Sequence, residues 1–276
     1  MKKTAQFRKL LAGGTVVMPG VFNAYAAMLV EAAGFAAYYV SGAGLANAVF
    51  GRPDVGLTTL KEATEHAARI DQAVAIPGIS DADTGFGGPK GMAKAVRAFE
   101  STGIAGIHLE DQWTDKRCGH LEGKKLVTID AMAAKIETAA KGKSEPDFLV
   151  IARTDARAVE GLESAIERAK AYVAAGADAI FAEALQSEEE FRAFRKAIDI
   201  PLLANMTEFG KTPSFTVDEF RAWGYNMVIF PMTLFRISAK TIQEALAELK
   251  TRGTQQGLLP RMQTRAELYQ LLKYTP

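Results

Sequence analysis

The sequence has little of what builds disulfide-stabilised, thiolate-metal or membrane proteins. Its 276 residues include one cysteine, Cys118, and three histidines. A single cysteine excludes an intrachain disulfide framework and a zinc site with several cysteine ligands. No stretch approaches the roughly 20 apolar residues that span a bilayer, and residues 1–9 lack the apolar run of a signal peptide. We therefore expect a cytoplasmic protein without a membrane partner.

An excess of charge of one sign is also missing. Lys and Arg number 33 against 32 Asp and Glu, which gives a formal net charge of +1. No part of the sequence is rich in Lys and Arg without acidic residues nearby, and this argues against a nucleic-acid partner. The length suits one large domain over residues 1–276, because α/β barrels of this size form single domains.

What the chain does have is a repeated unit of a short apolar run, a polar or Gly-containing tip and an amphipathic stretch. The runs are continuous and often β-branched or aromatic, as in strands that are buried on both faces. There are eight of them: Val16–Val21, Ala36–Val40, Val74–Ile79, Ile104–Leu109, Phe148–Ala152, Ala177–Ala182, Pro201–Ala204 and Asn226–Phe230.

The stretches between the runs have the pattern of helices. Leu162, Ile166, Ala169 and Val173 recur at helical spacing, and Gly176 follows as a stop. Strands that alternate with helices pair in parallel through right-handed crossovers. Eight such units predict an α/β fold of the (β/α)8 TIM-barrel type.

The C-terminal segment, from about residue 253, exceeds what eight units need. It contains a helical stretch, Arg261–Leu272. We expect this stretch to pack against the barrel or against a partner subunit.

Acidic residues gather at the ends of the predicted strands, where such barrels place their active sites. Asp81 and Asp83 follow the third run and Glu110 follows the fourth, while Asp54 lies in an earlier loop. Carboxylates from adjacent strands repel one another unless a cation lies among them. Oxygen ligands alone favour Mg²⁺ or Mn²⁺. The alternative is that Asp81 and Asp83 cap the next helix or pair with Arg153.

The loop after the fourth run is the second candidate for chemistry. Lys116 to His120 contain a thiol, an imidazole and two cations within five residues. Neighbouring cations lower the pKa of a thiol, so Cys118 is a candidate nucleophile or proton donor. The alternative is an ordinary cysteine beside a solvated basic patch.

Arginines and the remaining histidines complete the set of candidates. Arg153, Arg236 and Arg265 suit a substrate with several carboxylates, since a guanidinium matches the carboxylate fork; Arg265 is equally compatible with a surface position. His66 lies on a predicted helix and is expected on the exterior. His108 lies at the end of a strand, either orienting a ligand or filling the core.

Six ordered motifs carry a family resemblance over nearly the whole chain. The most specific are Lys116-Arg117-Cys118-Gly119-His120, which matches the lyase signature K-[KR]-C-G-H, and Asp81-Ala82-Asp83-Thr84-Gly85-Phe86-Gly87. The others begin at His108, Ala152, Asn205 and Met262. With these motifs the sequence resembles the isocitrate lyase / phosphoenolpyruvate mutase superfamily.

The resemblance implies a Mg²⁺-dependent carbon–carbon lyase that acts on a small tricarboxylate. The expected reaction is the cleavage of 2-methylisocitrate to pyruvate and succinate, a step of propionate catabolism. It implies Asp81, Asp83, Glu110 and Asp54 as metal residues. It implies Cys118 as the catalytic acid and His120 and Arg153 as further catalytic residues, while the base is either Tyr39 or a carboxylate linked to the metal. The substrate-binding set is Ser41, Gly42, Ala43, Lys116, Cys118, Gly119, Arg153, Glu183, Asn205, Met206, Thr207, Arg236 and Arg265. It also implies a homotetramer in which the eighth helix is exchanged between subunits.

Two positions depart from the family pattern, and several rival functions stay open. Ala43 stands where the family has a second Gly after Ser41, and Ala182 stands where it usually has Pro. The rivals within the superfamily act on 2,3-dimethylmalate, oxaloacetate or phosphonopyruvate. A Schiff-base aldolase is disfavoured because the Lys116 loop is strongly cationic and expected to be mobile. A barrel that only binds dicarboxylates is a further rival.

Overall fold

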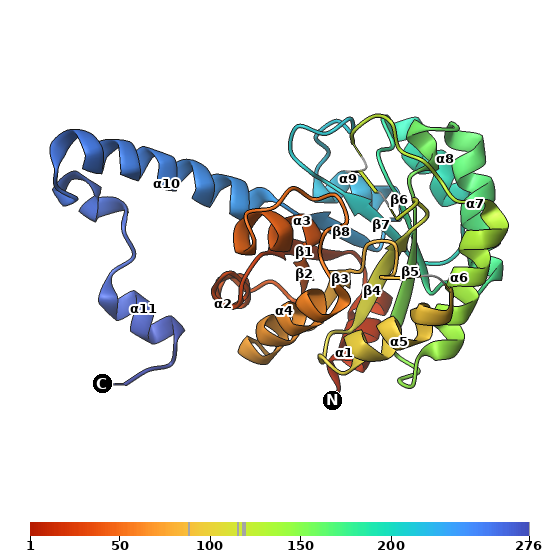
Figure 1. Cartoon of the computed structure of the whole chain (residues 1–276), viewed down its shortest axis with the longest axis horizontal. Coiled ribbons are helices and arrows are strands. Elements are labelled where there is room, and N and C mark those ends of the chain that lie inside the picture. The colour runs from red at the N-terminus through yellow and green to blue at the C-terminus, as the bar shows by residue number, and fades with distance from the viewer. Residues whose placement is uncertain (88, 115, 118–119, 276) are drawn as a thin grey trace.

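The computed structural model describes residues 1–87, 89–114, 116–117 and 120–275, and its centre is a closed barrel of parallel strands in chain order. The strands are β1 (Val16–Val21), β2 (Tyr38–Val40), β3 (Gly78–Asp81), β4 (Gly106–Glu110), β5 (Leu149–Thr154), β6 (Ala179–Ala182), β7 (Leu202–Asn205) and β8 (Met227–Phe230). β1 pairs with β8 and closes the ring (Figure 1). The (β/α)8 barrel expected from the apolar runs is confirmed.

The strand boundaries differ from the apolar runs in one consistent way. β4 and β7 end one residue later than expected, at Glu110 and Asn205, and β3 and β5 end two residues later, at Asp81 and Thr154. An apolar pattern omits these polar residues although their backbones continue the ladder. As a result Asp81 lies opposite His108, and Glu110 lies opposite Arg153. The register therefore places charged side chains next to one another at one end of the barrel.

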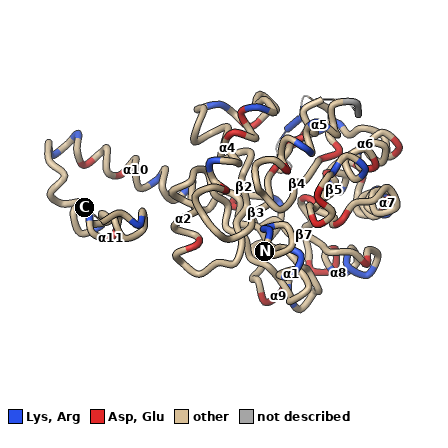
Figure 2. Tube along the Cα trace, turned by 90° about the horizontal axis from the view of Figure 1, so that it is seen from below, with Lys and Arg blue, Asp and Glu red and all other residues tan. Residues whose placement is uncertain are grey.

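Helices cover the outside of the barrel and one closes its base. Their bounds are α1 (Lys3–Gly13), α2 (Ala24–Ala32), α3 (Gly42–Gly44), α4 (Leu60–Ala73), α5 (Pro89–Glu100), α6 (Ile129–Gly142), α7 (Leu162–Ala174), α8 (Glu188–Ala197) and α9 (Val217–Ala222). Phe7 and Leu11 of α1 pack with Met18, Ile79 and other residues of the strands in one buried cluster. Charges of both signs are interspersed over these helices (Figure 2).

His66 corrects one expectation. It was expected on the exterior, but its residue is only 5% exposed. It belongs to the buried stripe of α4 together with Ala63, Ala67 and Ile70, which recur at helical spacing. The polar neighbours of His66 in the sequence concealed that stripe.

The C-terminal segment leaves the barrel. The 20-residue α10 (Thr233–Arg252) has no buried residue in the described chain and projects away from the strands (Figure 1). It exposes Ile237, Ile242 and Leu246, each by more than half. No helix among the described residues is long and apolar enough to cross a membrane.

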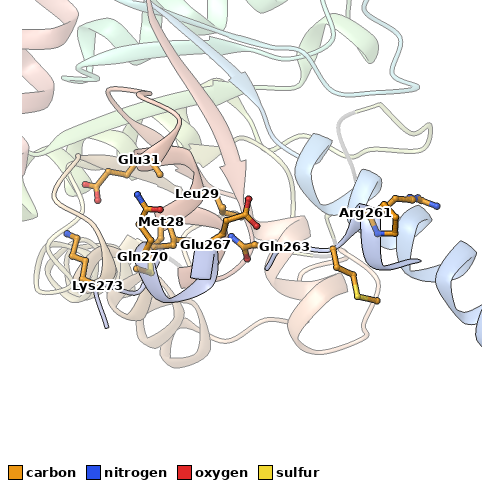
Figure 3. A pocket seen from close by; sticks show the side chains of 12 residues that line it. Met28, Leu29, Glu31, Arg261, Gln263, Glu267, Gln270 and Lys273 are labelled. Atoms are coloured by element: carbon orange, nitrogen blue, oxygen red, sulfur yellow. The ribbon is translucent and has the colours of Figure 1, made fainter. Parts of the chain in front are cut away.

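After α10 the chain returns towards α2 through a short 3-10 helix (Gln256–Arg261) and α11 (Arg265–Leu271). The expected helix from Arg261 was therefore too long, because Thr264 and Glu267 form a capping box that starts α11 at Arg265. A hollow of about 780 Å³ lies between α2 and this returning segment (Figure 3).

A second hollow, the apolar groove, lies where the eighth helix of such a barrel would pack. It measures about 880 Å³ and is lined by β1, α2 and the start of α10, including Phe22, Val30, Phe35, Phe230 and Leu234. Because α10 leaves the barrel, it does not cover this groove along its length.

Candidate active site

The polar ends of the strands surround a cavity of about 430 Å³. Most of the expected site residues line it: Tyr39, Ser41, Ala43, Asp54, Asp81, Lys116, His120, Arg153, Glu183, Asn205, Thr207 and Arg236. Among the described residues the apolar groove has no charged residue in its lining, and the hollow beside α2 is not formed by the ends of the strands. The cavity is therefore the candidate active site.

The structure separates a few expected residues from this lining. Met206 is 8% exposed and packs in the hydrophobic core, outside the lining of the cavity. Arg265 is exposed on α11 and does not line the cavity of its own chain, because α10 carries it away from the barrel. Cys118 and Gly119 lie outside the described residues.

Gly42 and Asp83 line a small cavity below the main one, together with Ser41 and Asp81. A Cβ added at Gly42 would lie 2.5 Å from Oδ2 of Asp81. Glycine at this position therefore lets the backbone after β2 approach the Asp81 carboxylate closely.

Lys116 supplies the cation that the acidic strand ends require. Its Nζ lies 2.8 Å from Oδ1 of Asp54 and 2.5 Å from Oδ1 of Asp83, and its side chain is 3% exposed. Burial alone lowers the pKa of Lys116, but Glu110, Asp83, Asp81 and Asp54 outweigh it and raise the pKa well above its usual value. The buried position contradicts the expected mobile loop position, while the retained proton disfavours a Schiff-base role.

The carboxyl groups around Lys116 have raised pKa values. Burial raises the pKa of Asp83 to about 6, against the opposing charge of Lys116. Burial likewise raises the pKa of Glu110 to about 8, although Arg153 and Lys116 act in the other direction. The pKa of Asp81 is also raised, again mainly by burial. These groups need cations nearby to remain ionised at neutral pH.

The donor set fits a hard divalent cation. Asp54, Asp81, Asp83 and Glu110 offer oxygen atoms, and both carboxylate oxygens of Glu110 are buried without a hydrogen-bond partner among the described residues. In the described part of the chain no three His, Cys, Asp or Glu side chains are grouped closely enough to hold an ion. The Lys116 ammonium instead lies between two of the four carboxylates.

Arg153 contacts three carboxylates, one just after its own strand β5 and two at the ends of the neighbouring strands β4 and β6. Its Nε and Nη2 donate to Asp155 at 3.1 and 3.2 Å, Nη1 lies 3.4 Å from Glu110 and Nη2 lies 3.3 Å from Glu183. Its guanidinium also lies over the Phe181 ring, 5.1 Å from the centroid. A bidentate pair fixes the plane of a guanidinium, so Arg153 is held in one orientation facing the cavity.

Sequence reasoning assigned no role to the residues behind Arg153. Asp155 is fully buried, and its Oδ1 also lies 3.3 Å from Nζ of Lys124, at the far end of the Lys116 loop. The Asp155 amide donates to Asp111 at 2.9 Å, and Asp111 also accepts from Thr154. The Arg153-Thr154-Asp155 motif was the available signal, but it did not reveal which side chains meet.

Tyr39 and His108 form a buried pair inside the barrel. The Tyr39 hydroxyl lies 2.8 Å from Nε2 of His108, which is itself 3.7 Å from Oδ1 of Asp81. Burial raises the pKa of Tyr39 well above its usual value and lowers the pKa of His108 to about 3. Tyr39 therefore keeps its proton at rest, and its role as the base stays a prediction. His108 is both a core residue and a neighbour of an expected metal carboxylate.

Three side chains surround the Glu183 carboxylate. Asn205 donates from 3.1 Å, Arg153 lies 3.3 Å away, and Nε2 of His120 lies 3.1 Å away. Burial raises the pKa of Glu183, but Arg153, His120 and Asn205 outweigh it and lower the pKa well below its usual value. Glu183 is therefore an ionised carboxylate at the floor of the cavity.

Arg236 lies at the mouth of the cavity. Its side chain is 46% exposed, and its Nε lies 3.5 Å from Oε2 of Glu208. Ser41 accepts a hydrogen bond from the amide of Gly44 at 3.0 Å, which stabilises the turn after β2. The cavity thus carries two buried cations, Lys116 and Arg153, a further cation at its mouth, and acidic residues between them.

Comparison with known proteins gives consistent matches. A family model described as phosphoenolpyruvate phosphomutase matches residues 7–250. A probable 2-methylisocitrate lyase 1 of Corynebacterium glutamicum is 50% identical over 99% of this chain and 90% of the relative. The 2-methylisocitrate lyase of Aeropyrum pernix is also 50% identical, over 94% of this chain and 83% of the relative.

Solved structures agree with these relatives. A 2,3-dimethylmalate lyase superposes with a TM-score of 0.93 at 35% identity, over 98% of this chain and 91% of that one. A phosphonopyruvate hydrolase in complex with oxalate and Mg²⁺ superposes with a TM-score of 0.89 at 28% identity, over 99% and 95% of the two chains.

Proposed function

Because the chain belongs to the phosphoenolpyruvate phosphomutase family, we propose that it is a carbon–carbon lyase that cleaves 2-methylisocitrate to pyruvate and succinate. Relatives at 50% identity carry the name of that activity. The observation that carries the proposal is the oriented Arg153 guanidinium, which faces the cavity beside the buried carboxylates at the strand ends. We place the reaction in the propionate-degrading methylcitrate cycle of the cytoplasm.

Mg²⁺, with Mn²⁺ as the alternative, is the proposed cofactor. Asp81 and Asp83 would hold it, with Glu110 and Asp54 reaching it through water. When bound, the ion supplies positive charge that stabilises negative charge developing on substrate oxygens. The structure of a relative with oxalate and Mg²⁺ supports this assignment.

The residues of this chain account for binding of a small tricarboxylate. Arg153 and Arg236 offer cations at two ends of the cavity, and a guanidinium matches a carboxylate. Phe181, Ile229 and Pro231 form an apolar part of the lining that suits the methyl group of the substrate.

The chemical step is a retro-aldol cleavage. A base removes the hydroxyl proton, that oxygen becomes the carbonyl of pyruvate, and the breaking carbon–carbon bond leaves its electron pair on the succinate half. Arg153 is placed to stabilise the resulting dianion. Because Tyr39 holds its proton, we assign the base to a carboxylate of the acidic strand ends. Cys118 then donates a proton to the carbanion, as the lyase signature implies.

The decisive experiment compares kcat/KM for 2-methylisocitrate, isocitrate and 2,3-dimethylmalate, with identification of the products. We expect 2-methylisocitrate to be preferred, although one methyl group contributes only about 1–3 kcal/mol. Preference for 2,3-dimethylmalate would support the second candidate, which the superposition on a lyase of that substrate favours. Cys118→Ser should bind substrate and lose most turnover, and near-normal turnover would reject the proposed acid.

We further propose that the enzyme is a homotetramer in which α10 of one copy covers the apolar groove of another. The unburied α10 and the uncovered groove support this arrangement. An apolar helix face and an apolar groove on the same soluble chain indicate an interaction site.

A further inference from the structure

His120 is held by a loop that sequence reasoning did not connect with it. The backbone amide of Lys211, in the loop after β7, donates to Nδ1 of His120 at 2.9 Å. The opposite nitrogen, Nε2, lies 3.1 Å from Oε1 of Glu183. Two segments that are 91 residues apart in sequence therefore meet at one imidazole ring.

The amide contact determines where the proton of His120 resides. A nitrogen that accepts a hydrogen bond carries no proton, so the neutral ring has its proton on Nε2. An imidazolium would set an N–H at Nδ1 against the N–H of Lys211, which is unfavourable. Nε2 lies next to the Glu183 carboxylate, 3.1 Å from Oε1 but without a hydrogen bond among the described residues, and Arg153 and Asn205 also contact that carboxylate.

Gly210 provides the space for the ring. A Cβ added there would lie 2.7 Å from Nδ1 and 2.8 Å from Cε1 of His120. Gly210 is not among the described glycines with positive φ, so other residues can adopt its backbone conformation. Cγ2 of Thr207 would also lie 2.9 Å from that Cβ, so the missing side chain is required by the imidazole and by Thr207 and not by the turn.

We propose that Gly210 and the backbone amide of Lys211 are positioning groups that fix the ring and the Nε2–H tautomer of His120, so that the protonated nitrogen lies on the side of Glu183 and the ring does not act as a base through Nδ1. The kinetic consequences of this inference depend on the proposed lyase function, but the tautomer itself does not. The loop after β7 thus sets the hydrogen-bonding direction of a residue on the loop after β4.

The tautomer is measured directly by solid-state NMR of the full-length enzyme labelled with ¹⁵N in histidine. Only three histidines contribute signals, and His120→Gln identifies those of His120. In the neutral ring we expect an unprotonated Nδ1 and a protonated Nε2. A neutral ring with its proton on Nδ1 would overturn the proposal whatever the enzyme's activity.

Two variants separate positioning from general structure. Gly210→Ala should displace the ring, and Lys211→Pro should remove the amide donor while Lys211→Ala retains it. For the first two we expect mixed His120 tautomers and a fall in kcat of about tenfold, the effect of one hydrogen bond, with a smaller change in KM. Lys211→Ala should keep the tautomer of the unmodified enzyme.

Gly13→Ala is the matched control, because nothing lies within 4 Å of a Cβ at Gly13; its kcat and ring signals should be unchanged. Unaltered His120 signals in Gly210→Ala would overturn the role of Gly210. If the unmodified enzyme shows the expected tautomer but does not cleave 2-methylisocitrate, the proposed function fails and the positioning inference stands.

Discussion

Replacing Lys116 with methionine tests whether its ammonium is the counter-ion of the acidic strand ends. Methionine keeps the length and apolar stem of the side chain but removes the charge. Nζ lies 2.8 Å from Asp54 and 2.5 Å from Asp83. At an effective dielectric constant of about 20, a pair at about 3 Å gains roughly 6 kcal/mol. Desolvation offsets part of this gain, so loss of one buried partner costs about 3–5 kcal/mol.

The loss of unfolding free energy in Lys116→Met should depend on pH, because the carboxylates that no longer contact Lys116 can take up protons. Burial already raises the pKa of Asp83 to about 6 and that of Glu110 to about 8, and removal of Lys116 raises both further. Carboxyl groups with raised pKa values hold more protons folded than unfolded. Stability is therefore retained at low pH and lost as pH rises through these values.

The assay is urea unfolding of the metal-depleted full-length enzyme at pH 6 and pH 8.5, with and without added Mg²⁺. We expect Lys116→Met to lose more free energy of unfolding at pH 8.5 than at pH 6, and Mg²⁺ to restore most of the loss. Lys125→Met is the control, since Lys125 is exposed on the same loop over the Trp113 ring. A variant as stable as the parent, or a loss insensitive to both pH and Mg²⁺, would refute the counter-ion role.

Three further predictions concern other parts of the molecule. Burial lowers the pKa of His66 to about 4 from 6.5, so the folded state binds fewer protons than the unfolded state and stability falls as pH decreases between these values. His66→Gln should remove up to about 3 kcal/mol of this pH dependence of the free energy of unfolding, measured with urea. A variant whose free energy of unfolding changes with pH as in the parent would contradict the prediction. Asp155→Asn weakens the bidentate pair that orients Arg153, and kcat/KM should fall about a hundredfold; a change below threefold would show that Arg153 is oriented by other groups. Ile242→Glu with Leu246→Glu charges the exposed face of α10, and sedimentation velocity should show dissociation into smaller species, whereas an intact assembly would reject docking through this face.

The sequence was sufficient to predict the barrel because its strands are buried on both faces. Runs such as Phe148–Ala152 have no other stable place in a protein of this length. The apolar pattern did not predict that β4 and β7 continue to Glu110 and Asn205, because these residues at the ends of the strands are polar. Barrel topology still indicated that Asp81 and Glu110 lie at the same end, because parallel strands bring their carboxyl ends together.

The arrangement of side chains within the site was less accessible. The sequence shows Lys116 only as one of several loop cations, and its burial between Asp54 and Asp83 depends on the path of the loop. Asp155 was visible next to Arg153, but spacing alone does not tell whether neighbouring residues pair. The place of Arg265 was inaccessible for a related reason: its motif matched the family, while its position depends on where α10 carries the chain.

The separation of α10 from the apolar groove has a genetic consequence in the proposed assembly. The helix and the groove are two halves of one contact, and each chain carries one copy of each. A chain with a damaged helix still offers a sound groove, and a chain with a damaged groove still offers a sound helix. Two defective alleles expressed together would therefore rebuild one intact contact in every mixed pair, so that defects which are severe alone partly complement one another.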